Sequence, residues 1–191
     1  MKMKTPTLCC ALVAAAFSYS PTFAADETRT SNSAAAAAQS DISARTDATR
    51  LSRSDRNFLE KAAQSGMKEV TVSQAALPNL QNAQVRSFAE MMINDHSKGN
   101  SEMMALAARK GVSLPDKSNK EMKLDDKWSK ADDDLDEDYM ETMVSDHKKA
   151  IDLHEEAARS NDPEIAAHAQ KMLPKLRSHL EQAQQLKELV D

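Results

Sequence analysis

The sequence predicts an all-α protein folded as an up-down four-helix bundle. Apolar residues recur at three- and four-residue spacing along four long stretches, as they do on the buried face of a helix. Glycine occurs only three times in 191 residues, and no stretch alternates like a strand. Two short loops and one long crossover, between the second and third stretches, join the four. This combination is typical of a four-helix bundle.

Residues 1–24 have the layout of a secretory signal peptide. Two lysines open the segment, and an apolar run follows from Leu8 to Phe17. We expect cleavage near Ala24 and a periplasmic or secreted protein. The run is too short for a permanent membrane span, and no later stretch predicts a transmembrane segment. Cys9 and Cys10 would be lost with the signal, which would leave the mature chain without a thiol.

Residues 25–53 are rich in Ala, Ser and Thr and have almost no large apolar side chain. Such a segment cannot bury enough surface to offset the entropy of ordering, so it predicts a disordered tether. The bundle domain is expected over residues 54–191. Ser54 is the expected N-cap of the first helix, and Pro78 should end it.

The other three helices follow from similar signals. Asn82 can cap a second helix that ends before Gly111. A third helix is expected over residues 137–159. Asp162 should cap the fourth, which Pro174 should kink.

The crossover over residues 112–134 should contain a short helix within residues 118–130. Its Trp128 is expected to cover one end of the core. The acidic run that follows, from Asp132 to Asp138, lacks the glycine and the ligand spacing of an EF-hand. Acids at a helix start are expected from the helix dipole, so calcium is disfavoured.

One motif occurs twice. Residues 88–98 read FAEMMINDHSK, and 51 positions later residues 139–149 read YMETMVSDHKK, with five of eleven pairs identical. On a helix, His96 and His147 each share a face with apolar residues three, four and seven positions away. Both histidines should therefore point towards a core. The Asp before each His lies about 100° round the helix, which suits an orienting or flanking role.

Helix spacing places one carboxylate and three imidazoles on the inward faces of four different helices. Bundle proteins build metal sites in this way, and imidazole with carboxylate would suit one divalent ion of zinc, copper or iron. The candidate ligands are Glu69, His96, His147 and His179, with Asp95, Asp146, Glu90 and Glu141 as flanking or second-shell groups.

A purely structural role explains the same residues, because buried polar side chains must be paired whether or not a metal is bound. The nine methionines that follow residue 24 are open to two interpretations as well. Soft copper(I) could use some of them, although a flexible core-filling side chain accounts for most. His154 and His168 are expected to be an ordinary surface or half-buried pair.

The bulk charge and the motifs exclude several functions. Without residues 1–24 the formal charge moves from −5 to −7, because that segment holds two lysines and no acid. An acidic protein without a basic patch is a poor candidate for nucleic acid. No Ser-His-acid spacing stands out, so an enzyme would be limited to metal-assisted or acid-base chemistry. A non-enzyme is therefore favoured.

The FLEKAAQSGMKEV opening, the two Asp-His motifs and the LPKLRSHL segment of the last helix resemble a bacterial exported family, domain-of-unknown-function family 4142. The resemblance covers Ser54 to Val190 and implies a ferritin-like bundle of unassigned biochemical role. Di-iron bundles place Glu three residues before a ligand His. Here Ile93, Val144 and Leu176 occupy those positions, so di-iron chemistry is not carried over.

Two functions follow as expectations. In the first, the protein is an exported bundle that binds one divalent metal through the central histidines and carboxylates. In the second, it is a non-catalytic envelope-stress or interaction protein whose central His/Asp/Glu network is purely structural. Its protein partner and oligomeric state do not follow from the sequence.

Overall fold

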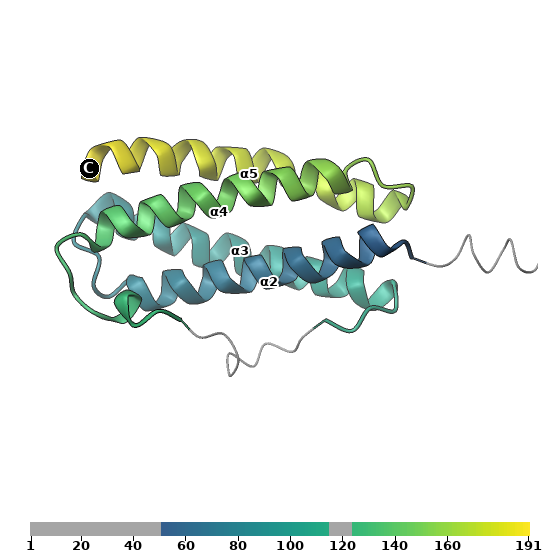
Figure 1. Ribbon diagram of the computed structural model, residues 1–191, viewed down its shortest axis with the longest axis horizontal. Helices are drawn as coiled ribbons and strands as arrows, with labels where there is room; N and C mark the ends of the chain where they lie inside the picture. Colours follow the sequence, from purple (N-terminus) through teal and green to yellow (C-terminus); the bar gives the residue numbers. More distant parts are fainter. Residues whose placement is uncertain (1–50, 115–123) are drawn as a thin grey trace, which may run out of the picture. The chain divides into compact units, whose positions relative to one another are not determined.

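The computed structural model describes residues 51–114 and 124–191. This part of the chain forms a four-helix bundle and contains no strand, which confirms the predicted class. The predicted signal peptide, nearly all of the predicted tether and residues 115–123 of the crossover lie outside the described residues. The elements are α2 (Arg53–Ala76), α3 (Ala83–Arg109), the 3₁₀ turn η1 (Asp126–Ser129), α4 (Leu135–Ala157) and α5 (Pro163–Val190) (Figure 1).

Three of the helices begin at a side-chain cap. Asn82 and Asp162 cap α3 and α5 as predicted, since each accepts backbone N–H groups of the first turn. The predicted cap of α2, Ser54, is wrong by two residues. The cap is Ser52, whose hydroxyl accepts the Asp55 N–H at 3.0 Å. Asp134 precedes α4 without capping it through its side chain.

The C-terminus of α3 shows why Gly111 stands there. Gly111 has φ of 67°, a left-handed conformation that suits glycine. The Val112 N–H reaches back to the Ala107 carbonyl at 2.9 Å and the Gly111 N–H to the Ala108 carbonyl at 3.1 Å, which is a Schellman motif. α5 is assigned as one continuous helix with Pro174 inside it, and the kink there stays a prediction.

The long crossover makes α3 and α4 run in the same direction. The aromatic rings that open the two repeated motifs, Phe88 and Tyr139, lie 6.5 Å apart between centroids. Eight residues further along both helices, His96 and His147 lie 5.4 Å apart. The two repeats are therefore parallel and in register. Figure 1 shows both helices starting at the same end, so the helix order is up, down, down, up.

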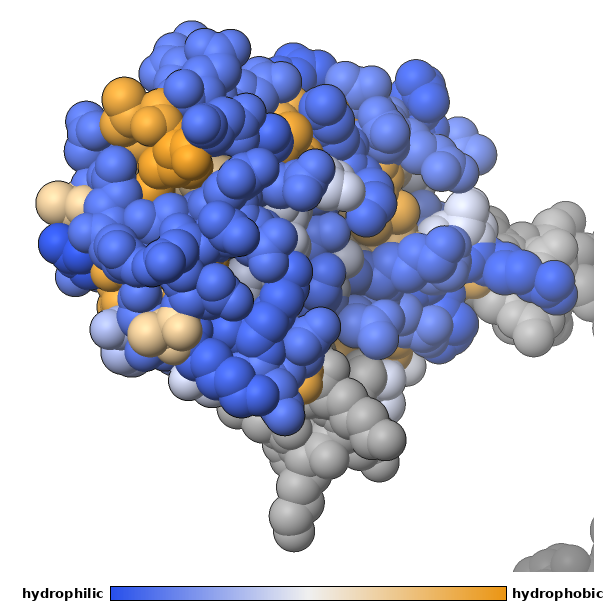
Figure 2. Space-filling view, turned by 60° about the vertical axis from the view of Figure 1, so that its left-hand side comes forward, coloured by the Kyte–Doolittle hydropathy of each residue, from blue (hydrophilic) through white to orange (hydrophobic). Residues whose placement is uncertain are grey.

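The core has two apolar clusters, one towards each end of the bundle. The first surrounds Phe88 and Tyr139, and the second surrounds Phe58 and Leu106. Trp128 of η1 is buried in the first cluster, 6.3 Å from the Tyr139 ring, so it covers that end as expected. The face of the molecule in Figure 2 is mostly hydrophilic, with small separate hydrophobic areas. None of the described helices is long and apolar enough to cross a membrane.

One member of the acidic run has a clear structural role. Asp136 is buried, and its two carboxylate oxygens accept the backbone N–H groups of Gln81 and Asn82 at 3.0 and 2.6 Å. These contacts tie the start of α4 to the α2–α3 turn. Acidic side chains near free backbone N–H groups are favoured by the local dipole.

Candidate metal centre

Four polar side chains meet between the two apolar clusters, one from each helix. Glu69 of α2, His96 of α3, His147 of α4 and His179 of α5 are 1%, 8%, 0% and 2% exposed. The three histidines offer ring nitrogens that all lie within 4.8 Å of one another. The inward placement that the sequence predicted for these four residues is therefore what the structure has.

The ring arrangement is nearly symmetrical. Each of the three imidazole centroids lies 5.4 Å from the other two. The His147 Nε2 to His179 Nδ1 distance is 3.4 Å, and Glu69 Oε2 lies 2.8 Å from His96 Nε2 and 3.9 Å from His147 Nε2. Metal–nitrogen bonds of 2.0–2.1 Å in a tetrahedral site would place ligand atoms about 3.3 Å apart. The observed distances scatter around that value.

Hydrogen bonds fix which nitrogen of two histidines carries the proton. The Nδ1 of His147 lies 2.9 Å from the Met143 carbonyl oxygen, which can only accept, so this nitrogen donates. The Nε2 of His179 lies 3.1 Å from Asp95 Oδ2 and donates to that carboxylate. In the neutral rings, His147 Nε2 and His179 Nδ1 therefore both present lone pairs. Two lone pairs that face each other at 3.4 Å are repulsive unless a cation lies between them.

Glu69 and His96 add a second unsatisfied pair. Among the side chains of residues 51–114 and 124–191, only Glu69 Oε2 and His96 Nε2 are buried without a hydrogen-bond partner. The two atoms are 2.8 Å apart, a contact that is an ion pair only when His96 is protonated. Buried polar atoms without partners are rare and costly. A metal ion bound to both would satisfy them.

The charges of the cluster favour a cation. Burial alone would raise the pKa of Glu69, but attraction to His96, with His147 and His179, holds that pKa below its usual value. Burial lowers the pKa of His147. Burial, together with the neighbouring imidazoles, lowers the pKa of His179 to about 4. Metal binding requires an ionised carboxylate and neutral imidazoles, and a bound cation would supply the positive charge that favours ionised Glu69.

The flanking residues separate into three groups. Asp95 accepts from His179 and also pairs with Lys175 Nζ at 3.0 Å. Asp146 faces away and pairs with Lys68 at 2.5 Å. The structure does not bring the other two predicted flanking residues to the cluster, because Glu90 and Glu141 are exposed on the outer faces of α3 and α4.

Two supporting groups were missed by sequence reasoning. The Met143 carbonyl is a backbone acceptor four residues before His147, a relation that any helix offers and that no residue type announces. Lys175 lies four residues before His179 on α5, so helix spacing places the two side by side. That spacing could have predicted that the Lys175 ammonium group lies beside His179 and its partner Asp95.

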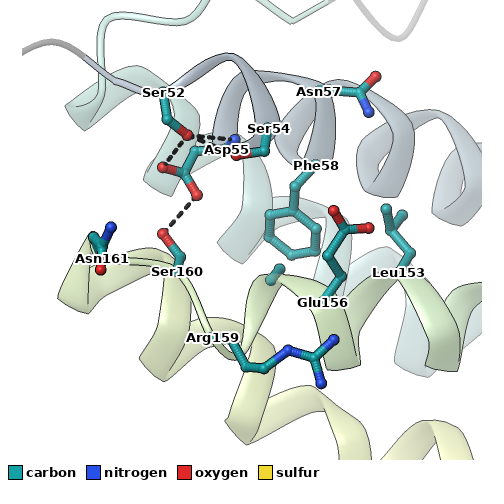
Figure 3. A pocket seen from close by; sticks show the side chains of 11 residues that line it. Ser52, Ser54, Asp55, Asn57, Phe58, Leu153, Glu156, Arg159, Ser160 and Asn161 are labelled. Carbon is teal, nitrogen blue, oxygen red and sulfur yellow. Dashed lines mark hydrogen bonds between the residues drawn. The ribbon is translucent and has the colours of Figure 1, made fainter.

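A separate hollow of about 210 Å³ lies where α2 starts, beside the α4–α5 turn (Figure 3). Its central carboxylate, Asp55, accepts the hydroxyl protons of Ser52 and Ser160, both at 2.6 Å. These hydrogen bonds tie the start of α2 to the α4–α5 turn.

Comparisons with known proteins agree with this fold. A family model described as a domain of unknown function, DUF4142, matches residues 40–186. The chain belongs to the DUF4142 family. A comparison with curated protein sequences gave no significant match.

Two solved structures have a similar fold. One is a DUF305 fragment from Deinococcus radiodurans, with a TM-score of 0.61 and 14% identity, covering 73% of this chain and 98% of that one. The other is CopM in its Cu(I)-bound form, with a TM-score of 0.59 and 15% identity, covering 73% of this chain and 97% of that one. At this identity the likeness shows a shared fold. It does not carry a function.

Proposed function

We propose that this DUF4142 protein is an exported metal-binding bundle. Glu69, His96, His147 and His179 would hold one transition-metal ion in the middle of the core, with Asp95 orienting His179. The observation that carries the proposal is the pair of lone pairs that His147 and His179 turn towards each other, with the buried Glu69 and His96 atoms beside them. A structural network would be expected to pair them.

The donor set limits the metal. Imidazole and carboxylate ligands suit zinc, copper and iron, and the softest ligands, thiolates, do not occur after residue 24. The similar fold of CopM, which was solved with Cu(I) bound, makes copper the first metal to test. The bound ion would neutralise the buried Glu69 carboxylate and satisfy the imidazole lone pairs. We assign no catalytic step to it.

The test is elemental analysis and thermal unfolding of the untagged chain, purified after expression with its own N-terminal segment. We expect one equivalent of metal per chain. A ligand at 100 times its Kd stabilises a protein by about 2.7 kcal/mol, so the melting temperature should rise on addition of the correct metal. His96→Ala with His147→Ala should abolish both effects.

Matched carboxylate variants separate a ligand from a charge effect. Glu69→Gln removes the buried carboxylate, whereas Glu90→Gln and Glu141→Gln remove exposed ones. Only Glu69→Gln should weaken metal binding. If no metal copurifies or raises the melting temperature, or if all three variants bind alike, the proposal is wrong and the structural interpretation is favoured.

Export is the part of the proposal that rests on residues 1–24 alone. The lysines, apolar run and small residues before Ala24 support it. N-terminal sequencing of the protein recovered from a periplasmic fraction should start at Ala25 or Asp26. A retained N-terminus would contradict export by cleavage.

A further inference from the structure

Two helical turns from the central cluster, the same four helix faces carry a second set of side chains. α3 and α4 run towards the Phe58 end of the bundle, and α2 and α5 run away from it. Seven residues towards that end, α3 carries Met103 after His96 and α4 carries His154 after His147. On α5 the numbers fall in that direction, so the step leads from His179 to Met172. On α2 the corresponding position is Ala62. The step is about 10 Å along the helix axis.

These side chains share one cavity. Ala62, Met103, His154 and Met172 all line a space of about 40 Å³, and Glu69 and His96 line it from the central cluster. About 10–15 Å³ is enough for one water molecule, so the space admits an ion. The same step in the opposite direction leads only to apolar residues: Ala76, Ala89 and Met140 of the core, and Leu186, which packs against it.

His154 is oriented in the same way as His147. Its Nδ1 lies 2.7 Å from the carbonyl oxygen of Ala150, four residues earlier, and donates to it. The Nε2 therefore carries the lone pair. The Phe58 ring packs edge-on against the imidazole with centroids 5.1 Å apart, which helps to hold its orientation. A ring N–H donated to a carbonyl is the usual support of a metal-binding histidine.

Two of the three glycines in the chain also line this cavity. Gly66 and Gly99 lie inside α2 and α3, where glycine destabilises a helix. A Cβ at Gly99 would come within 3.2 Å of the Met172 methyl group, and a Cβ at Gly66 would collide with the Asn100 side-chain oxygen. The two glycines thus leave room for the side chains that line the space.

We propose that Met103, His154 and Met172 form a second metal site, which takes a soft monovalent ion such as Cu(I). Two thioethers and one imidazole are ligands that select Cu(I) over harder ions, whereas the central cluster offers a carboxylate and no sulfur. The second site does not depend on the proposed function of the first, because its ligands are different residues on the next layer of the bundle.

Silver tests this site without redox chemistry, because Ag(I) shares the ligand preference of Cu(I). In a Cys9→Ser, Cys10→Ser background, so that no thiol competes, the chain is labelled at the methionine methyl groups and titrated with Ag(I). The Met103 and Met172 methyl resonances should shift first, with one equivalent of silver. Met91 and Met104, which do not line the cavity, should not shift with it.

Substitutions supply the matched control. Met103→Leu with Met172→Leu keeps the apolar volume and should weaken Ag(I) binding at least 100-fold, while Met91→Leu with Met104→Leu should leave it unchanged. Circular dichroism checks that both variants fold. Equal silver affinity in the two variants, or a first shift at other methionines, would overturn the second site.

One further variant separates the two proposals. His147→Ala with His179→Ala removes two ligands of the central cluster that do not line the cavity and should keep the Ag(I) site. If silver binds but zinc, copper and iron do not bind at the central cluster, the second site is supported and the central metal site is rejected. Loss of Ag(I) binding in a folded His147→Ala, His179→Ala variant would instead assign the silver to the central cluster and contradict the second site.

Discussion

The two Asp-His motifs are identical at five of eleven positions and differ in the contacts that the fold gives them. His96 and His147 lie level with each other in the central cluster. Asp95, however, accepts a hydrogen bond from His179 of a third helix, whereas Asp146 pairs with Lys68 at the surface. A repeated motif on parallel helices thus gives equivalent histidines and non-equivalent aspartates, because only one Asp faces α5.

The largest expected effect is the response of the metal-free protein to acid. A histidine whose pKa in the folded state lies below the unfolded value of about 6.5 binds its proton more readily after unfolding. Folding stability should therefore fall as the pH drops from about 6.5 towards 4, the pKa to which burial and the neighbouring imidazoles lower His179. That residue alone accounts for up to about 3 kcal/mol, and His147 acts in the same direction.

Denaturant unfolding between pH 7.5 and 4 measures this loss. The two aspartates should differ here, since the hydrogen bond that His179 donates to Asp95 opposes the burial that lowers the His179 pKa. Asp95→Asn should therefore steepen the acid loss, and Asp146→Asn should steepen it less, because Asp146 raises the His147 pKa only through its charge. A flat stability profile in this range would contradict neutral buried imidazoles.

The next effect is the metal affinity of the same two variants. A carboxylate that accepts the second ring N–H of a metal-binding histidine typically contributes 10- to 100-fold in affinity. Asp95→Asn should weaken binding by about this factor, and Asp146→Asn should change it less than about twofold. Competition with a chromophoric chelator measures both. Equal loss in the two variants would mean that the aspartates act through charge and not through His179.

The fold could be predicted from the sequence because helix spacing, caps and breakers are local signals. The four inward polar residues followed from the same periodicity. The flanking role of Asp95 was predicted, but its partners were not, since they depend on the α3–α5 packing that brings Lys175 and His179 to it. Glu90 and Glu141 were included for their position along the helices, but the rotation of each helix exposes them.

The second layer shows a limit of a different kind. Met103, His154 and Met172 are each seven residues from a predicted ligand, so the spacing was visible in the sequence. The sequence did not show whether the second layer lies seven residues before or seven residues after each ligand, because that depends on whether the crossover makes α3 and α4 parallel. The ring contacts between Phe88 and Tyr139 and between His96 and His147 fix that register.

The smallest effect concerns the two lysines that pair with the two aspartates. Exposed ion pairs contribute about 0–1 kcal/mol, so Lys68→Met and Lys175→Met should each change unfolding free energy by less than about 1 kcal/mol. Metal affinity should separate them. Without Lys175, Asp95 accepts more strongly from His179, and a positive charge near the ion is removed. Lys175→Met should therefore tighten metal binding roughly two- to fivefold.

Lys68→Met is the control for this charge effect, because its partner Asp146 contacts none of the four candidate ligands through a hydrogen bond. It should change the metal affinity less than about twofold. Raising the ionic strength to about 1 M, where the Debye length is about 3 Å, should shrink the part of the Lys175→Met effect that comes from charge. Equal tightening in both variants would assign it to net charge alone, and the Asp95–His179 hydrogen bond would then have no measurable part in binding.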